Sequence, residues 1–330
     1  MRVAISGASG IVGRAIEAAL KNHGLTVLRL VRKAARQLVR QPAGNVNELC
    51  WDPTAANGGF ERPEALEGLR AVVHLSGAPV VGRRWTAKYK EEIRASRVAS
   101  TRVLAEALVR LERRPEVLIT ASAVGYYGDR GDEILDEDSA AGTGFFPEVC
   151  SAWEAAVRPA EEAGIRVVHL RFGVVLGAKG GALGQMLPLF RLGLGGKLGS
   201  GRQWMSWVSE ADVAGAALFA LNGGRLDANG LDADGEAKPA LSSSAKLSGP
   251  VNVVGPQAVI NAEFTRELGR AVHRPAIVPA PAFALRLAFG EMADEALLAS
   301  QRVRPKRLLE AGFAFRHATL AEALAAALAK

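Results

Sequence analysis

Cysteine, aromatic residues and long apolar runs are all scarce in this chain of 330 residues. Only two cysteines occur, Cys50 and Cys150, which is too few for a disulfide framework, and neither has metal-ligand spacing. No apolar run reaches the roughly eighteen residues of a membrane span, and no signal peptide is recognisable before the first strand. We therefore expect a cytoplasmic protein without a metal site and without a membrane partner.

Charge of one sign is also not concentrated anywhere in the chain. Lys and Arg number 41 against 34 Asp and Glu, a formal net charge of +7. The excess is spread over Arg-rich helical stretches, whereas nucleic-acid binding usually requires a clustered basic patch with groove-reading elements. We expect no nucleic-acid partner, and an anionic small molecule explains the basic balance equally well.

The most informative residues present are the first thirteen, MRVAISGASGIVG. An apolar run stops at a turn with glycines at positions i, i+3 and i+6, and an amphipathic stretch follows at once. Strand, glycine turn and helix in this order bind the pyrophosphate of a dinucleotide on free N–H groups at the helix N-terminus. The residues expected to form this site are Gly7, Ser9, Gly10, Ile11, Val12 and Gly13.

Acidic residues are absent between Lys21 and Asn47, and this absence bears on the choice of dinucleotide. NAD sites usually have an Asp or Glu at the end of the second strand, which accepts hydrogen bonds from the ribose 2′-hydroxyl. Here that strand, 26–31, is followed by Arg32. A guanidinium can bind a 2′-phosphate through two parallel hydrogen bonds. We expect NADP, with Arg32 as its main 2′-phosphate contact.

Apolar strand patterns alternate with helical patterns along the first half of the chain. Strands are expected at 26–31, 71–75, 117–120 and 166–171, and helices at 86–111 and 148–163. This alternation predicts an α/β fold of the Rossmann type, with a doubly wound parallel sheet.

The same pattern suggests a division of the chain. We expect an NADP-binding domain over 1–178, completed in its sheet by segments from 207–221 and 250–256. A smaller substrate-binding region follows over 179–330. Within it, residues 222–249 are small and polar and read as a flexible insertion.

Several motifs resemble those of the short-chain dehydrogenase/reductase superfamily, in its extended, sugar-nucleotide-epimerase-like branch. They are GASGIVG at 7–13, VVHLSG at 72–77, ASAVGYYG at 121–128, LRFGVVLG at 170–177, WVSEADVAGA at 207–216 and VNVVGP at 251–256. Segments 82–104, 193–207 and 304–316 are more narrowly similar to the atypical "epimerase family protein" subgroup. The resemblance implies a Rossmann fold and a nicotinamide cofactor.

One departure from the family changes the expected chemistry. Extended members carry Tyr-x-x-x-Lys on the helix that here covers 148–163, usually followed four residues later by Glu. Counting back from Glu154 aligns Phe146 with the tyrosine and Cys150 with the lysine. Phenylalanine has no transferable proton, and cysteine has no positive charge with which to lower a neighbour's pKa. The usual catalytic pair is therefore absent.

The resemblance assigns the remaining site residues. Ser122 aligns with the family's third catalytic group, and Tyr127 is a candidate replacement proton donor, although a Tyr at this position also commonly forms a pocket wall. Further cofactor contacts are expected from Asp52, Leu75, Ser76, Gly77 and Cys150. Substrate contacts are expected from Arg84, Trp85, Phe146 and Arg202.

Two functions from different classes fit these features. The first is an NADP(H)-dependent epimerase- or reductase-like enzyme that acts on a small, anionic or sugar-nucleotide-like substrate with a rebuilt proton-transfer group. The second is a non-catalytic NADP(H)-binding sensor or regulatory module. Extended relatives dimerise through two helices that correspond to 86–111 and 148–163, so we also expect a homodimer.

Overall fold

The computed structural model describes residues 1–32, 47–55, 59–224 and 246–329. Within them, the first half of the chain alternates strands and helices. Its elements are β1 (Arg2–Ser6), α1 (Ile11–Asn22), β2 (Thr26–Arg32), β3 (Glu48–Trp51), η1 (Pro63–Leu66), β4 (Ala71–His74), α3 (Ala87–Val109), β5 (Val117–Ala123), η2 (Val124–Tyr127), β6 (Ile134–Leu135), α4 (Phe145–Ala155), α5 (Arg158–Glu162), β7 (Arg166–Phe172) and β8 (Val174–Leu176).

The second half contains shorter strands and more helices. Its elements are α6 (Gly181–Arg191), β9 (Trp204–Met205), β10 (Trp207–Ser209), α7 (Glu210–Leu221), β11 (Gly249–Val253), β12 (Val259–Ile260), α8 (Asn261–Ala271), α9 (Ala282–Phe289), η3 (Ala293–Leu297), β13 (Arg302–Val303), α10 (Lys306–Glu310) and α11 (Leu320–Leu328).

Seven parallel strands form the central sheet, in the order β11-β7-β5-β4-β1-β2-β3. The order reverses at β1, from which successive strands extend in both directions. This is the doubly wound arrangement expected from the sequence, and it leaves a crevice at the carboxyl ends of β1 and β4, where such sheets bind ligands.

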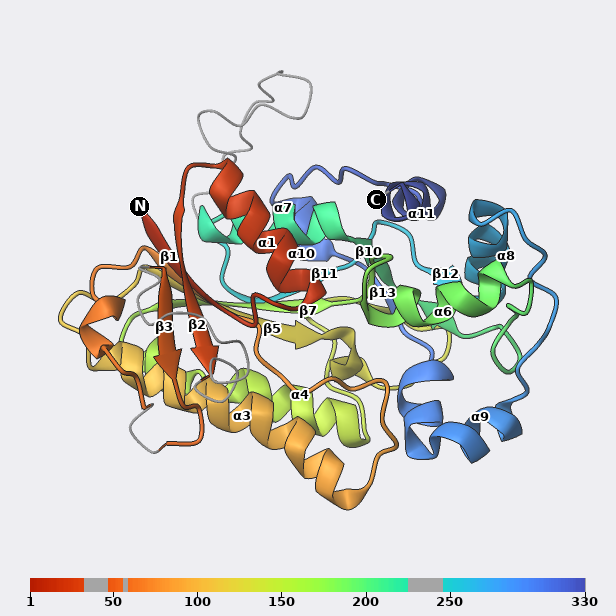
Figure 1. Cartoon of the computed structure of the whole chain (residues 1–330), viewed down its shortest axis with the longest axis horizontal. Helices are drawn as coiled ribbons and strands as arrows, with labels where there is room; N and C mark the ends of the chain where they lie inside the picture. The colour runs from red at the N-terminus through yellow and green to blue at the C-terminus, as the bar shows by residue number, and fades with distance from the viewer. Residues whose placement is uncertain (33–46, 56–58, 225–245, 330) are drawn as a thin grey trace.

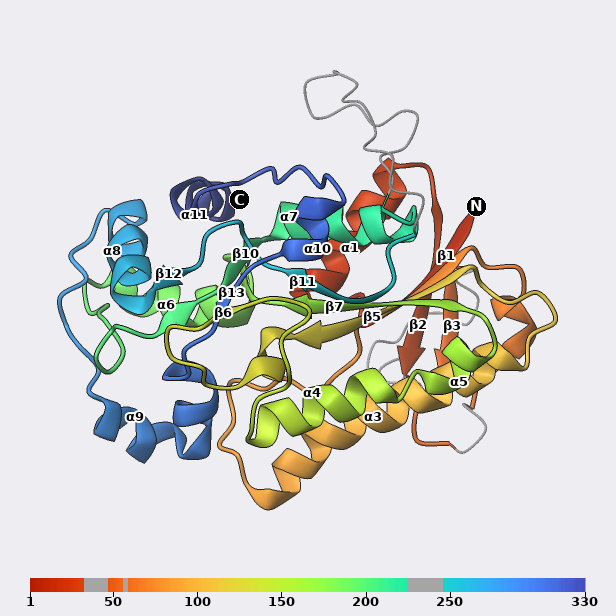
Figure 2. The same cartoon turned by 180° about the vertical axis from the view of Figure 1, so that it is seen from behind.

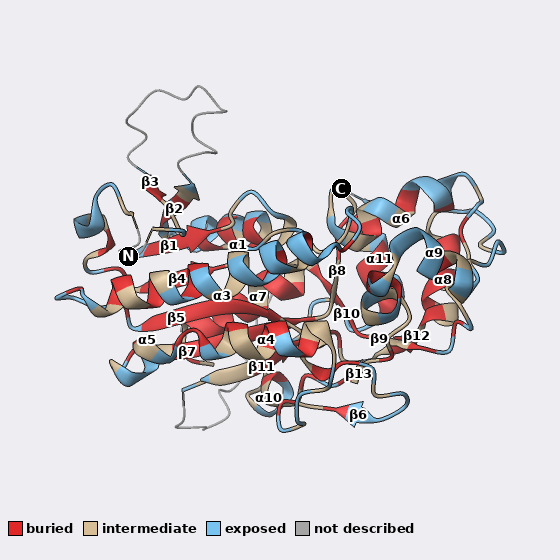
Figure 3. Cartoon of the chain, turned by 90° about the horizontal axis from the view of Figure 1, so that it is seen from below, coloured by how far each residue is buried: buried red, intermediate tan, exposed pale blue. Residues whose placement is uncertain are grey.

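Helices cover both faces of the sheet, as the two side views show (Figures 1 and 2). Alternate residues of β1 point to opposite faces. Val3 and Ile5 belong to a cluster with α1 and α7, whereas Ala4 belongs to a cluster with α3 and residues around α5. Figure 3 shows buried strands between helices whose outer sides are exposed. The expected fold class is confirmed.

A smaller group of elements packs beside the carboxyl ends of the strands (Figure 1). Helices α6, α8 and α11 share a separate apolar cluster that includes Trp207, Phe190 and Phe264. Trp207 is 1% exposed, so it is a core residue of this second region. The division at residue 178 stays a prediction, because α7, β11 and α10 return to the main sheet.

Three expectations about segments differ from the structure or lie outside it. The helix expected over 148–163 is two helices, α4 and α5, with Pro159 in the first turn of the second. Residues 207–221 add no strand to the main sheet, since β10 pairs with β8 and α7 covers the sheet face. In the expected insertion 222–249, residues 225–245 lie outside the described residues.

The two helices expected at a dimer interface lie side by side on one face of the sheet (Figures 1 and 2). Ile93, Leu104 and Leu108 of α3 are fully buried within the chain. The outward positions of α3 are mostly charged, and the homodimer stays a prediction. No described helix is long and apolar enough to cross a membrane, and no three His, Cys, Asp or Glu side chains of the described residues are grouped as metal ligands.

His74 joins the ends of β1 and β4 from inside the protein. Its Nδ1 lies 2.7 Å from Ser6 Oγ, and its Nε2 lies 3.3 Å from Ser100 Oγ on α3. Ser6 Oγ also accepts a hydrogen bond from the N–H of Leu75. Burial lowers the pKa of His74 to about 4. A neutral histidine therefore fixes the two strand ends that flank the ligand crevice.

Acid should weaken the fold through His74. The unfolded chain binds a proton near the ordinary pKa of 6.5, whereas the folded protein resists protonation until about 4. The stabilising contribution is therefore complete above pH 6.5 and is lost as the pH falls toward 4. Between pH 7 and pH 5 we expect His74 to lower the free energy of unfolding by about 2 kcal/mol.

Denaturant unfolding at both pH values measures this effect. The substitution His74→Gln should flatten the pH dependence, whatever it does to stability at pH 7. The matched control is His23→Gln, which alters an exposed histidine. Equal losses between pH 7 and pH 5 in all three proteins would show that His74 is not responsible.

Candidate functional site

The glycine turn between β1 and α1 packs tightly against the loop that follows β4. Gly7 has a φ of 71°, a conformation that favours glycine. A Cβ atom on Gly7 would lie 2.8 Å from the carbonyl carbon and oxygen of Leu75, and one on Gly13 would lie 2.2 Å from the carbonyl oxygen of Gly7. Both positions exclude a side chain, while Ser9 and Gly10 are exposed. The turn is therefore shaped to present its backbone to a ligand.

The N-terminus of α1 is suited to an anion. Gly10 is its N-cap and has no side chain to accept from the first N–H groups, and the first turn contains no acidic residue. Ile11 and Val12 are half-buried at the start of the helix. Arg14 Nη1 donates to the carbonyl oxygen of Ser9 at 2.5 Å, which adds a positive charge at this end. A helix N-terminus with these features attracts a phosphate group.

Two arginines of β2 differ in their availability. Arg29 Nε donates to both carboxylate oxygens of Glu17 on α1, at 2.9 and 3.1 Å. This hydrogen bond raises the pKa of Arg29. Arg32, the last residue of β2, is exposed and has no carboxylate partner among the described residues. Arg32 is thus the cation of this strand that remains available to a ligand.

Asp52 follows β3 and closes a local turn. Its Oδ1 accepts from the N–H and the hydroxyl of Thr54 at 2.9 and 2.6 Å. The preceding residue, Trp51, is fully buried and stacks on Phe60 with 5.4 Å between the ring centres. The contact of Asp52 with an adenine amino group stays a prediction.

The loop after β4 lies between the glycine turn and α3. Leu75 touches Gly7, as described above, and the N–H of Ala78 donates to Ser96 Oγ on α3 at 2.9 Å. A Cβ atom on Gly77 would lie 3.1 Å from the guanidinium carbon of Arg97. The structure thus brings Leu75, Ser76 and Gly77 to the same crevice as the glycine turn.

Ser122, near the end of β5, is part of a buried polar chain. Its hydroxyl donates to Glu154 Oε1 at 2.6 Å. Arg171 donates to both oxygens of Glu154, at 2.8 and 2.7 Å, and the exposed fractions of the Arg171 and Glu154 side chains are 3% and 12%. The hydroxyl of Ser122 is therefore oriented by a carboxylate that a buried guanidinium holds in place.

Tyr127 is the next residue of this hydrogen-bonded network and lies inside the protein. Its hydroxyl accepts from Arg171 Nη1 at 3.0 Å and donates to Asn252 Oδ1 at 2.9 Å. The side chain is fully buried, and burial raises the pKa of Tyr127 to about 12. Its hydroxyl hydrogen is already donated and no solvent reaches it, so the geometry favours a structural role over the expected proton donor.

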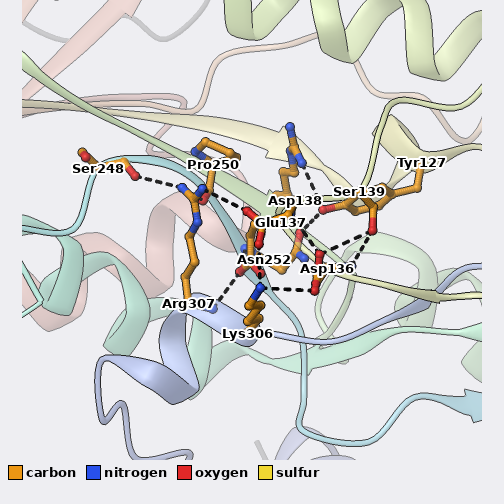
Figure 4. A network of polar contacts seen from close by, with 11 residues as sticks. Tyr127, Asp136, Glu137, Asp138, Ser139, Ser248, Pro250, Asn252, Lys306 and Arg307 are labelled. Atoms are coloured by element: carbon orange, nitrogen blue, oxygen red, sulfur yellow. Dashed lines mark hydrogen bonds and ion pairs between the residues drawn. The ribbon is translucent and has the colours of Figure 1, made fainter.

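Figure 4 shows where this chain continues beyond Tyr127. The N–H of Asn252 on β11 donates to Glu137 Oε1 at 2.9 Å, and the N–H of Arg307 on α10 donates to the same oxygen at 3.3 Å. Lys306 Nζ lies 2.6 Å from Asp138 Oδ2. These contacts connect the sheet edge to the C-terminal segment of the chain.

Phe146 and Trp85 lie together as a wall of the site. The Trp85 indole packs edge-on against Phe146, with 4.9 Å between the ring centres, and donates its N–H to the carbonyl of Val80 at 2.9 Å. The carboxylate of Glu295 accepts from the N–H groups of Phe145 and Phe146 at 3.1 and 3.2 Å. A residue of η3 therefore caps the start of α4 and sets the position of Phe146.

Cys150 lies one turn after Phe146 and is 2% exposed. Burial raises the pKa of its thiol to about 12. The thiolate is the nucleophilic form of cysteine, so Cys150 packs in this helix rather than attacking a substrate. Its contact with a nicotinamide ribose stays a prediction.

The two arginines expected to bind substrate are both exposed. Arg84 precedes α3 and approaches Gly290 after α9, and Arg202 precedes β9. Neither has a carboxylate partner among the described residues. Trp204, near Arg202, donates its indole N–H to Asp132 at 2.8 Å and lies under the guanidinium of Arg302. The substrate contacts of Arg84 and Arg202 stay predictions.

Sequence reasoning assigned no site role to four residues that the geometry places around α4. They are Arg97, Glu154, Arg171 and Glu295. Arg171 lies in the motif at 170–177 that carries the family resemblance, and Glu154 matches the Glu that usually follows the family's Tyr-x-x-x-Lys, so both had a usable signal. Glu295 lies 149 residues after Phe146, and nothing in the local sequence indicates that contact.

A doubly wound parallel sheet with a glycine turn opening α1 defines a dinucleotide-binding protein of the Rossmann type. The chain belongs to the NAD dependent epimerase/dehydratase family, whose model matches residues 3–230. Residues 280–327 match a domain of unknown function, DUF1731. The family resemblance found in the sequence is confirmed.

Three relatives illustrate this membership. Epimerase family protein Mb2239 of Mycobacterium bovis is 47% identical over 98% of this chain and 96% of its own length. The crystal structure of human epimerase family protein SDR39U1 with NADPH has a TM-score of 0.83 and 32% identity, and the match covers 100% of both chains.

The third is a structure of a nucleoside-diphosphate sugar epimerase from Corynebacterium glutamicum. It has a TM-score of 0.71 and 34% identity, and the match covers 99% of this chain and 58% of that one. The NADPH in the human structure agrees with the cofactor expected from Arg32. The cytoplasmic location stays a prediction.

The buried pair of Arg171 and Glu154 should be essential for stability. Removing one partner of a buried pair leaves an uncompensated charge and typically costs about 3–5 kcal/mol. We expect Arg171→Met to lower the free energy of unfolding by about that amount, measured by denaturant titration. The control is Arg286→Met, which breaks an exposed pair with Asp294 and should change stability little. A stable Arg171→Met protein would contradict the prediction.

Proposed function

We propose that this protein is an NADPH-dependent enzyme of the epimerase or reductase type, which acts on a small anionic, sugar-nucleotide-like substrate. One observation carries the cofactor assignment: a glycine turn with no room for a Cβ atom at Gly7 or Gly13 opens α1 beside β2, and Arg32 at the end of β2 has no carboxylate partner among the described residues. The human relative crystallised with NADPH supports the same cofactor.

The strand order gives the line along which this cofactor would lie. Neighbouring strands run β2, β1, β4 and β5. Arg32 would hold the 2′-phosphate beyond β2, and the start of α1 would hold the pyrophosphate. The nicotinamide half would then lie over the carboxyl ends of β4 and β5, next to Gly77 and Ser122. When bound, NADPH supplies the hydride.

Ser122 and Glu154 offer a route for the proton. Because the Ser122 hydroxyl donates to Glu154, the lone pairs of Oγ are free to accept from a substrate hydroxyl. In the oxidising direction, the substrate proton passes to Ser122 Oγ while the serine proton passes to Glu154. Reduction reverses both transfers. Phe146 contributes no proton, so this route replaces the missing tyrosine.

The substrate class is suggested by two exposed arginines, one beside the wall that Trp85 and Phe146 form and one in the second region. Arg84 lies just before Trp85, and Arg202 lies in the second region beside Trp204. Arginine binds phosphate or carboxylate groups through paired hydrogen bonds, and an aromatic face suits a sugar or planar ring. The sequence similarity to a nucleoside-diphosphate sugar epimerase agrees with this class.

The cofactor assignment predicts a preference for NADPH over NADH that depends on Arg32. A charge-assisted contact is worth about 1.5–3 kcal/mol, so Arg32→Glu should remove the preference and leave NADH binding little changed. Titration calorimetry with both cofactors measures it. Arg110→Glu alters an exposed arginine just after α3 and is the control. Equal affinities of the unmodified protein for NADPH and NADH would overturn the assignment.

The proton route predicts that turnover is slow and that it depends on the hydroxyl of Ser122. We expect weak NADPH oxidation with small ketones and faster oxidation with nucleoside-diphosphate keto sugars, followed by absorbance at saturating cofactor. General acid–base catalysis contributes about 10²–10⁴-fold, so Ser122→Ala should lower kcat at least a hundredfold. Ser151→Ala, on the same helix as Glu154, is the control. No oxidation with any carbonyl, despite tight NADPH binding, would instead indicate a non-catalytic binding protein.

A further inference from the structure

Arg97 is an unpaired cation that reaches the crevice from α3. Its guanidinium lies against Gly77, where an added Cβ atom would be 3.1 to 3.3 Å from the guanidinium carbon and both terminal nitrogens. Among the described residues it makes no ion pair with a carboxylate. Its guanidinium donates a hydrogen bond to the carbonyl of Ile93 on its own helix, at 3.1 Å.

Trp153, Cys150 and Tyr89 also lie near Arg97. The guanidinium lies over the ring of Trp153, 5.1 Å from the ring centre. Cys150 lies one turn before Trp153 on α4, and the charge of Arg97 partly opposes the rise in the pKa of that thiol. Tyr89 also lies within electrostatic range. Burial lowers the pKa of Arg97 itself, as expected for a cation that has lost water without gaining a partner.

A partly buried guanidinium without an anionic partner costs free energy in the free protein. That cost is offset when a ligand supplies acceptors at the guanidinium. Arg97 is half-buried rather than sealed, so a ligand that lies over Gly77 can reach it. The position is also beside Cys150, which stands where the relatives of this family carry a lysine.

We propose that Arg97 binds the nicotinamide ribose of NADPH and supplies, from α3, the positive charge that α4 lacks at Cys150. The guanidinium donates to the ribose hydroxyls while the ring of Trp153 keeps it in place. Binding therefore gives the guanidinium hydrogen-bond acceptors in addition to the carbonyl of Ile93. The inference rests on the proposed NADPH binding and concerns the half of the cofactor that Arg32 does not touch.

The test compares two ligands, of which only one contains the nicotinamide half of the cofactor. NADPH contains both halves, whereas adenosine 2′,5′-bisphosphate contains the 2′-phosphate and the adenosine but no nicotinamide ribose. Arg97→Met keeps an unbranched side chain over Trp153 and removes the charge. We expect it to weaken NADPH about 10- to 100-fold in calorimetry and to leave the bisphosphate affinity unchanged. Arg94→Met and Arg102→Met, at exposed positions of α3, should leave both affinities unchanged.

Thermal unfolding without ligand distinguishes a ligand-binding role of Arg97 from a purely structural one. Removing an uncompensated charge should leave the melting temperature of Arg97→Met equal to or above that of the unmodified protein, while the shift on adding NADPH becomes smaller. A lower melting temperature with unchanged NADPH affinity would overturn the proposal, as would an equal loss for both ligands. If the unmodified protein bound no NADPH, the proposed function itself would fail, which is a separate outcome.

Discussion

The ion pair between Arg171 and Glu154 determines the geometry of the candidate site. Arg171 comes from β7, the strand next to the β11 edge of the sheet, and Glu154 comes from the last turn of α4. Two short hydrogen bonds join them in the interior, and each partner carries a further contact outward. Glu154 orients Ser122 at the crevice, while Arg171 holds Tyr127 and, through it, Asn252. One buried charge pair thereby connects the carboxyl end of β5 to the edge strand β11.

The candidate site differs from the pattern that the family resemblance implies mainly in which elements supply its polar groups. At the two helical positions where the family resemblance implies a tyrosine and a lysine, α4 presents a phenyl ring and a buried thiol. Polar groups reach the same crevice from other elements: a serine from β5, a carboxylate from the next turn of α4 and a guanidinium from α3. The chemistry available is that of a hydroxyl backed by a carboxylate, with a fixed cation nearby, rather than that of an acidic phenol.

Local patterns in the sequence are sufficient to predict the fold class and the cofactor. The glycine spacing at 7–13 and the absence of acids after β2 are properties of short segments, and the alternation of strands and helices follows from residue periodicity. The sequence analysis does not predict strand β3, because Glu48–Trp51 contains a charged residue and no β-branched residue, unlike the equally short Ala71–His74. The break between α4 and α5 at Pro159 was also missed, although proline in a helical pattern is a recognisable signal.

The reactive end was harder to predict because its contacts join distant parts of the chain. By its position after β5, Tyr127 is a candidate proton donor. In the structure its buried hydroxyl donates a hydrogen bond to Asn252, which lies 125 residues later. Arg97 reads in sequence as one of several arginines on a charged helix. Only the packing of α3 against Gly77 and Trp153 distinguishes it from Arg94 and Arg102.

The carboxylate of Glu295 at the start of α4 has a consequence for the order in which the site is completed during synthesis. Domains form as units while the chain emerges, beginning from the N-terminus. The glycine turn and Arg32 are made within the first 32 residues, and the last strand of the sheet is made by residue 253. The wall at Phe146 lacks its cap until residue 295 has left the ribosome. The residues of the glycine turn are therefore synthesised long before the residue that fixes the wall at Phe146.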